Sequence, residues 1–102
     1  MENKLEVANE ILKQLGGNRF AMMTGAKNFA GGHDYLSFKI PSNNKKRVSH
    51  VIVKYNVGQD LYEMKFLAVR GVNTKEVVSF EGVFCDQLQS IFTEVTGFYT
   101  KL

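Results

Sequence analysis

The sequence predicts an α+β domain: an antiparallel β-meander of four or five strands, with an N-terminal and a C-terminal helix packed on one face. Three observations predict this class. Apolar residues recur at helical spacing near both ends of the chain. The central part holds short runs that alternate apolar and polar residues, and these runs are joined by turns too short for helical crossovers. Both helices need an apolar surface to cover, and a half-buried sheet provides one.

The chain has 102 residues, which suits a single domain spanning 1–102. Its composition, 44% hydrophobic and 23% charged, is that of an ordinary globular protein. A single cysteine, Cys85, excludes an internal disulfide framework and a cysteine zinc site. The charged first fifteen residues do not resemble a signal peptide, and no run is long enough for a membrane span. We therefore expect a cytoplasmic protein of a bacterial host, either a monomer or a homodimer, that does not enter a membrane.

The first predicted element is a helix. Asn3 can cap it together with Glu6, and Gly16 and Gly17 end it. Its apolar face holds Leu5, Ala8, Ile11, Leu12 and Leu15. The next run, Arg19–Thr24, is a candidate strand that Gly25 would end, with Gly31 and Gly32 forming the turn into the following strand.

Three further strands are predicted by alternation: Tyr35–Ile40, Val48–Tyr55 and Leu61–Arg70. Lys75–Phe80 adds another after the turn at Gly71. The turn at 56–60 fixes a hairpin whose register gathers apolar pairs on one face and opposite charges on the other. The predicted pairs are Tyr55 with Tyr62, Val53 with Met64, Val51 with Phe66, and Lys54 with Glu63.

The last predicted element is a helix over approximately Phe84–Thr96, which Gly97 ends. Its apolar stripe holds Phe84, Leu88, Ile91, Phe92 and Val95. Cys85 lies beside this stripe, so we interpret it as a buried or half-buried structural cysteine rather than a reactive thiol.

The glycine-rich stretch from Gly16 to Gly32 does not match a nucleotide-binding loop. Gly25-Ala26-Lys27 lacks the hydroxyl residue and the following helix of a phosphate loop, and no βαβ unit is predicted. His33 and His50 have no cysteine or carboxylate at ligand spacing, so we predict no metal site. No nucleophile, base or metal cluster can be assembled, and we predict no catalytic residues, no cofactor and no enzyme.

Basic residues are the strongest functional signal. The polar loop Pro41–Arg47 ends in three bases, and lysines flank it on the strands that it connects. A flexible basic loop can follow a phosphate backbone, and a base interleaved with an aromatic residue is typical of single-strand binders. The predicted nucleic-acid contacts are Tyr35, Lys39, Lys45, Lys46, Arg47 and Lys54. The alternative interpretation is a solubilising loop with lysines that discourage aggregation.

A protein contact is the second interpretation. The loop after Gly25 is a candidate partner-binding loop, with Lys27, Asn28 and Phe29 as its contacts. The outer sheet face adds Ile52, Leu67, Val69 and Val77, which are apolar for a face that carries lysines. The C-terminal tail or the loop over 25–34 is an alternative cover for this face.

Three stretches resemble a family of small phage and mobile-element proteins to which no activity is assigned. They are ILKQLGGNRFAMMTGAKNF (Ile11–Phe29), LSFKI (Leu36–Ile40) and DQLQSIFTEVTGFYTKL (Asp86–Leu102). The PSNNKKR loop is more basic than the family pattern. The resemblance implies a setting in a bacterial cytoplasm, and it carries no site residues. Together with the basic residues it predicts a non-enzymatic accessory protein that binds nucleic acid. The alternative is a module that binds and modulates a host defence or replication protein.

Overall fold

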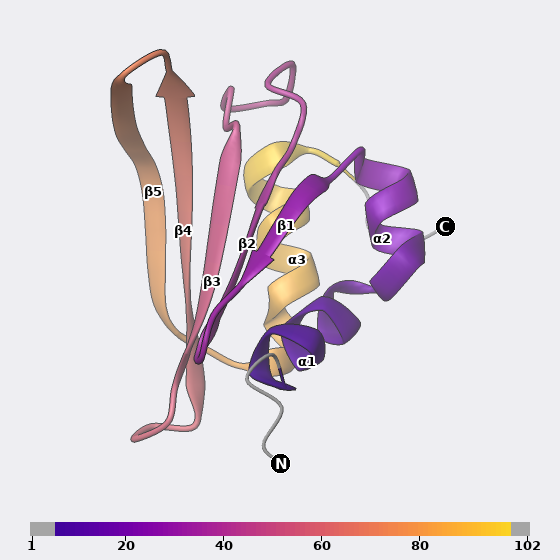
Figure 1. Ribbon diagram of the computed structural model, residues 1–102, viewed down its shortest axis with the longest axis vertical. Helices are drawn as coiled ribbons and strands as arrows, with labels where there is room; N and C mark the ends of the chain where they lie inside the picture. The colour runs from indigo at the N-terminus through magenta and orange to yellow at the C-terminus, as the bar shows by residue number, and fades with distance from the viewer. Residues whose placement is uncertain (1–5, 99–102) are drawn as a thin grey trace.

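The computed structural model describes residues 6–98, which form three α-helices, one short 3₁₀ helix and five strands (Figure 1). Along the chain these elements are α1 (Glu6–Leu15), α2 (Gly17–Thr24), β1 (Lys27–Gly31), β2 (Tyr35–Lys39), β3 (His50–Asn56), β4 (Leu61–Arg70), β5 (Asn73–Val83), η1 (Cys85–Gln87) and α3 (Leu88–Thr96). The predicted cap at Asn3, the position of Leu5 and the tail after Phe98 lie outside the described residues.

The strands form one antiparallel sheet in the order β1-β2-β3-β4-β5, so each strand pairs with the next one along the chain. This confirms the predicted α+β class and its antiparallel meander, with five strands. The predicted register of the β3–β4 hairpin is also confirmed in every pair: Tyr55 with Tyr62, Val53 with Met64, Val51 with Phe66, and Lys54 with Glu63.

The hydrophobic core joins the helices to alternate residues of the sheet. In the view of Figure 1, α1 and α2 lie to the right of the strands, and α3 overlaps β1 and β2. Phe20 of α2 is fully buried, and its ring centroid lies 5.3 Å from that of Phe38 on β2 and 5.1 Å from that of Phe92 on α3. Both pairs meet edge to face, an arrangement that aromatic rings favour. These three rings connect two helices and the sheet at one point.

The prediction of a strand at Arg19–Thr24 is wrong, because these residues belong to helix α2. The buried residues of α2 are Phe20 and Thr24, four residues apart on one helical face, while Met22 between them is 83% exposed. A strand would have placed all three on the same face. Gly25 therefore ends a helix and not a strand: it adopts the left-handed conformation and donates its N–H to the carbonyl of Ala21.

The predicted loop that contains Lys27, Asn28 and Phe29 is instead the edge strand β1. All five residues of β1 are exposed, and its pairing with β2 shifts register between Lys27 and Ala30. Asn28 has a positive φ of 55° at this irregularity. Phe29 packs on Phe38, with 5.5 Å between the ring centroids, but no residue of β1 is fully buried. The sequence therefore has no apolar alternation by which the strand could be recognised.

Cys85 is exposed, so its interpretation as a buried or half-buried residue is wrong. The chain enters the last helix through the 3₁₀ turn η1, and Cys85 is the first residue of that turn. The buried stripe begins at Leu88, one turn later, and continues through Phe92 and Val95. Cys85 therefore lies before the part of the helix that packs on the sheet.

Replacing Phe20 with alanine should lower the free energy of unfolding by about 3–5 kcal/mol, because it removes a fully buried ring and leaves a cavity. Met22→Ala on the same helix should change it by less than about 0.5 kcal/mol, since that side chain is in water. Urea unfolding of both variants measures the difference. Equal effects at the two positions would contradict the assignment of Phe20 to the core.

Candidate functional site

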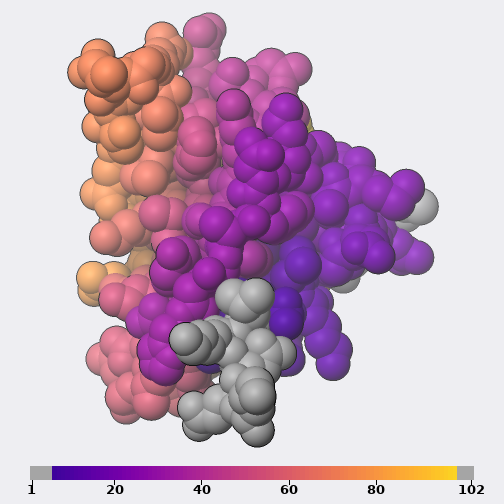
Figure 2. All heavy atoms as spheres, viewed as in Figure 1, coloured from indigo at the N-terminus to yellow at the C-terminus, as the bar shows by residue number. Residues whose placement is uncertain are grey.

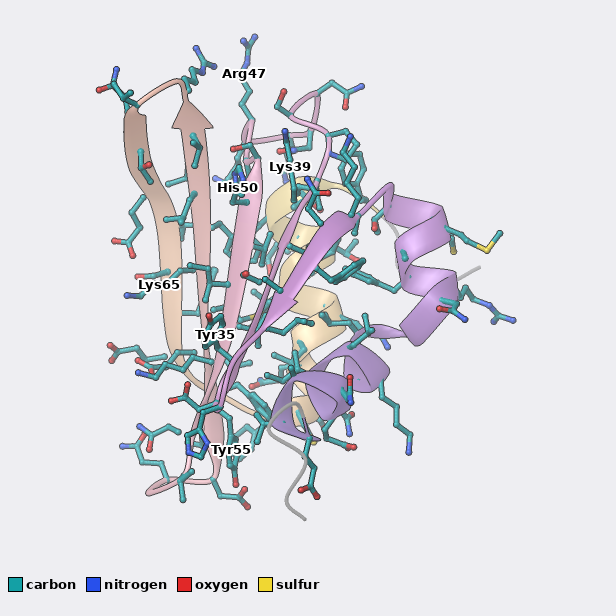
Figure 3. All side chains as sticks on the ribbon, in the orientation of Figure 1. Tyr35, Lys39, Arg47, His50, Tyr55 and Lys65 are labelled. Atoms are coloured by element: carbon teal, nitrogen blue, oxygen red, sulfur yellow. The ribbon has the colours of Figure 1, made fainter. Side chains whose placement is uncertain are left out.

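Six basic side chains belong to one end of the sheet. Because neighbouring strands are antiparallel, the start of one strand lies beside the end of the next, and bases far apart in the sequence come together. We call this set the basic end: Lys27 on β1, Lys39 on β2, Lys46 and Arg47 in the β2–β3 loop, Arg70 on β4 and Lys75 on β5. In Figure 3 Arg47 extends from the top of the molecule, with Lys39 below it.

Two hollows adjoin at the basic end. One, of about 430 Å³, is lined by four of the bases, namely Lys27, Lys39, Arg47 and Arg70. The other, of about 500 Å³, is lined by Lys46, Arg47, Arg70 and Lys75. The two share Arg47, Ala68 and Arg70, and neither lining includes an acidic residue. A concave surface with charges of one sign attracts anions more strongly than a flat surface does.

The charges of the basic end are not neutralised within the protein. Among residues 6–98 the one ion pair within 4.0 Å joins Lys54 to Asp34, away from both hollows. Lys27 even stands directly opposite Lys39 across the β1–β2 ladder. Like charges in facing positions are unfavourable in a sheet. Local rules of this kind are broken most often at functional positions.

The β2–β3 loop is tied to the body of the protein, so it is not the free, flexible loop that we expected. The Asn44 amide donates to the carbonyls of Pro41 and Val48, each at 2.6 Å, and its oxygen accepts the N–H of Val48 at 2.9 Å. Arg47 donates its N–H to the carbonyl of Asn44 and has a positive φ of 57°. This left-handed conformation is uncommon outside glycine and asparagine, and here the bonded loop maintains it.

Lys45 differs from its two neighbours. Its N–H donates to the carbonyl of Thr96 at 3.0 Å, and its Nζ lies 3.5 Å from the carbonyl oxygen of Glu94. Both oxygens belong to the last turn of α3, where a cation is favoured by the helix dipole. Lys45 therefore joins the loop to α3 and lines neither hollow.

The structure brings three of the six predicted nucleic-acid contacts together; Lys45 bonds to α3, and the other two lie elsewhere. Lys39, Lys46 and Arg47 lie at the basic end, but Tyr35 pairs with Lys54 at the other end of β2. At about 3.3 Å per residue, Tyr35 is about 13 Å along the strand from Lys39. Figure 3 shows the two side chains at different heights of the sheet. The Tyr35 ring packs on Gly32, where an added Cβ would come within 2.1 Å of it. Lys54 Nζ lies 4.0 Å from the Asp34 carboxylate.

Sequence reasoning did not place Arg70 and Lys75 in the site, and it gave Lys27 to a different one. Arg70 ends β4 and Lys75 lies near the start of β5, on either side of a two-residue turn. The predicted meander could have placed these residues in the site. Once five antiparallel strands are placed in order, the bases at alternate strand ends fall on one edge.

The opposite end of the molecule is acidic. Hollows there are lined by Glu6, Glu10 and Asp60 together with two tyrosines. Tyr55 donates a hydrogen bond to the Asp60 carboxylate, and this raises the pKa of its phenol; burial raises the pKa of Tyr62. A phenol with a raised pKa stabilises the fold below its ordinary pKa of 10.0, and that contribution is lost as the pH rises further.

The apolar residues predicted for the outer sheet face between the two ends are less exposed than the sequence suggested. Ile52, Leu67, Val69 and Val77 are all half-buried, and none is among the large exposed hydrophobic residues. The segment over 25–34 extends the sheet as β1 rather than covering this face. Within residues 6–98 no group of three or more histidine, cysteine or carboxylate side chains could hold a metal ion.

Comparison with known proteins finds no matching family model, curated protein or solved structure. In the described part of the chain, no helix has the length and hydropathy needed to span a bilayer.

Replacing Asn44 with alanine should lower the free energy of unfolding by about 1–3 kcal/mol, because the buried Val48 loses the partners of its backbone groups. Asn43→Ala is the matched control: the neighbouring side chain is exposed and should be replaceable at little cost. Urea unfolding gives the stability, and hydrogen exchange at the Val48 amide reports the loop itself. Unchanged exchange in Asn44→Ala would show that this side chain does not hold the loop.

Proposed function

We propose that the protein binds the phosphate backbone of nucleic acid through the basic end. The observation that carries this proposal is the set of six bases around two adjoining hollows with no acidic residue in either lining. Contacts between Lys or Arg and phosphates release counterions, and this release supplies most of the affinity of such proteins. The acidic opposite end repels phosphates, so it favours a single orientation on the ligand.

The shape of the site favours a polymer over a small ligand. Both hollows are open to solvent, whereas small-molecule pockets bury most of their ligand. They also join side by side from β1 to β5. Four strand spacings of about 4.8 Å make this path about 19 Å long, which is enough for several successive phosphates of one backbone.

Base stacking is not part of the proposal. Neither hollow is lined by an aromatic residue, and Tyr35 lies at the other end of β2 on Gly32. Single-strand binders gain much of their affinity from stacked aromatic rings. The backbone contacts proposed here therefore depend on charge and should vary steeply with salt.

The wider role that we propose is that of a small, non-enzymatic accessory protein of a phage or mobile element, acting in the cytoplasm of its bacterial host. The support is the resemblance of the stretches Ile11–Phe29 and Asp86–Leu102 to such proteins. A role in binding rather than catalysis accords with a site whose charged residues are all cations, because phosphate contacts position a ligand and transform nothing by themselves.

The edge strand β1 favours a second candidate function, the binding of a host protein. β1 is exposed along its whole length, Phe29 on it is 38% exposed, and Met22 of the preceding helix is 83% exposed. An exposed strand edge can pair with an extended segment of a partner. Such binding should withstand high salt and weaken in Met22→Asp. Binding that disappears in high salt would count against it.

The proposed function is tested by salt titration of binding to labelled DNA and RNA, single-stranded and duplex, by fluorescence anisotropy. The double variant Lys46→Gln/Arg47→Gln removes two bases of the basic end. We expect weaker binding and a plot of log affinity against log salt whose slope is smaller by about 2. Lys45→Gln should have a smaller effect, because Lys45 bonds to α3.

The matched control is Lys13→Gln/Arg19→Gln, which removes the same charge from exposed positions on α1 and α2. Its slope should equal that of the unmodified protein. If the control pair lowers the slope as much as the loop pair, the binding follows net charge alone and the basic end is not the site. If nothing binds at low salt, the proposed function is wrong.

A further inference from the structure

The β4–β5 hairpin extends beyond the rest of the sheet. The last pair between β3 and β4 is His50 with Leu67, but β4 and β5 continue through three more pairs, which end at Arg70 with Asn73. At about 3.3 Å per residue, this two-stranded ribbon reaches about 10 Å past the β3–β4 ladder. Ser49 still contacts β4 here, since its hydroxyl accepts the N–H of Val69 at 2.8 Å, so within residues 6–98 the part without a neighbouring strand or loop bond is the tip from Arg70 to Asn73. Figure 2 shows its tip, in orange at the upper left, at the same end of the molecule as the β2–β3 loop.

The tip of the ribbon carries three exposed side chains with no task in the fold. Gly71, with φ 61°, allows the two-residue turn, and Val72 after it is 99% exposed. Arg70 and Asn73 are exposed and face each other across the last pair. Among residues 6–98, neither side chain has a hydrogen-bond or ion-pair partner. The most exposed large apolar residue of the described chain thus lies between a free guanidinium and a free amide.

These three side-chain types recognise different bases in the major groove of DNA. Arginine bonds both acceptors of guanine, asparagine bonds adenine in the same bidentate way, and an apolar side chain contacts the methyl group of thymine. The groove of B-form DNA is about 12 Å wide and 8.5 Å deep, and it admits a two-stranded ribbon.

We propose that the tip of the β4–β5 hairpin, Arg70 to Asn73, enters the major groove of duplex DNA and reads base edges there. The inference rests on the proposed function, because the basic end supplies the phosphate contacts. The second hollow separates the hairpin from Lys46 and Arg47 of the loop. One phosphate backbone bordering the groove occupies this space, with Lys75 of the hairpin on one side and Lys46 and Arg47 of the loop on the other.

The ligand is DNA rather than double-stranded RNA. The major groove of an A-form helix is deep and narrow, and protein side chains do not reach its base edges. The binding therefore has two separable parts. Lys46, Arg47 and Lys75 provide affinity for any backbone, and the tip provides a preference among duplex sequences.

The test begins with selection of the full chain against a library of random DNA duplexes. We expect a short motif to be enriched, and the selected duplex is then compared with a scrambled duplex by anisotropy. Arg70→Lys keeps the charge but loses the bidentate fork, and Asn73→Ala loses the amide. Each should reduce the ratio of the two affinities by roughly 5- to 100-fold and leave the salt slope on the scrambled duplex unchanged.

Lys75→Gln is the matched control on the same hairpin. This variant should bind the selected and the scrambled duplex more weakly by the same factor, so the ratio of the two affinities stays unchanged. The slope of log affinity against log salt should become smaller by about 1. Replacing thymine with uracil in the motif removes only the methyl group. This change should weaken binding of the unmodified protein, and it should have a smaller effect on binding of Val72→Ala, whose side chain is shorter. All these positions are exposed, and thermal unfolding confirms that each variant is folded.

The outcomes distinguish this inference from the function on which it rests. Salt-dependent binding to every duplex with no enriched motif would overturn groove reading and keep backbone binding. A motif that Arg70→Lys and Asn73→Ala leave intact would also overturn it, because other residues would then read the sequence. Failure to bind any nucleic acid at low salt would overturn both proposals.

Discussion

The antiparallel register of β3 and β4 is the constraint on which the rest of the structure depends. It places Val51, Val53, Met64 and Phe66 on the face that packs against the helices. A slip of one residue would turn every one of these side chains to the opposite face. The opposite charges of Lys54 and Glu63 meet in this register as well, so packing and electrostatics specify the same alignment.

The same antiparallel order explains how a domain with a formal net charge of only +3 acquires a strongly basic end. Alternate strand termini lie on one edge, and this edge collects bases from all five strands or their connections. The acids at Glu6, Glu10 and Asp60 lie at the other end. The charge separation comes from topology rather than composition, and bringing Lys27 opposite Lys39 opposes folding locally. The core has to supply the free energy that offsets this repulsion.

Most of the sheet could be predicted from the sequence because β2, β3 and β4 each bury one face, and burial of one face leaves a period of two in the sequence. Apolar alternation did not indicate the correct element where the alternating residues are not all buried. Phe20, Met22 and Thr24 alternate like a strand, but only Phe20 and Thr24 are buried. No residue of β1 is fully buried, and its one large apolar side chain, Phe29, gives no alternation, so the strand leaves no pattern of period two. The loop bases were visible as a run, whereas Arg70 belongs to the basic end only through the fold.

Three consecutive basic residues in the β2–β3 loop show that neighbouring charges in the sequence need not contribute to the same site. The hydrogen bonds of Asn44 fix the loop, and within that fixed loop the three side chains diverge. Lys45 turns to the carbonyl end of α3, where it stabilises a helix terminus. Arg47, in its left-handed conformation, lines both hollows, and Lys46 lines one. A loop without these bonds would have to lose conformational entropy on binding, and each ordered long side chain costs about 0.5–1.5 kcal/mol. The fold bears the cost of ordering the loop backbone in advance, so more of the Coulombic attraction of Lys46 and Arg47 remains for the ligand.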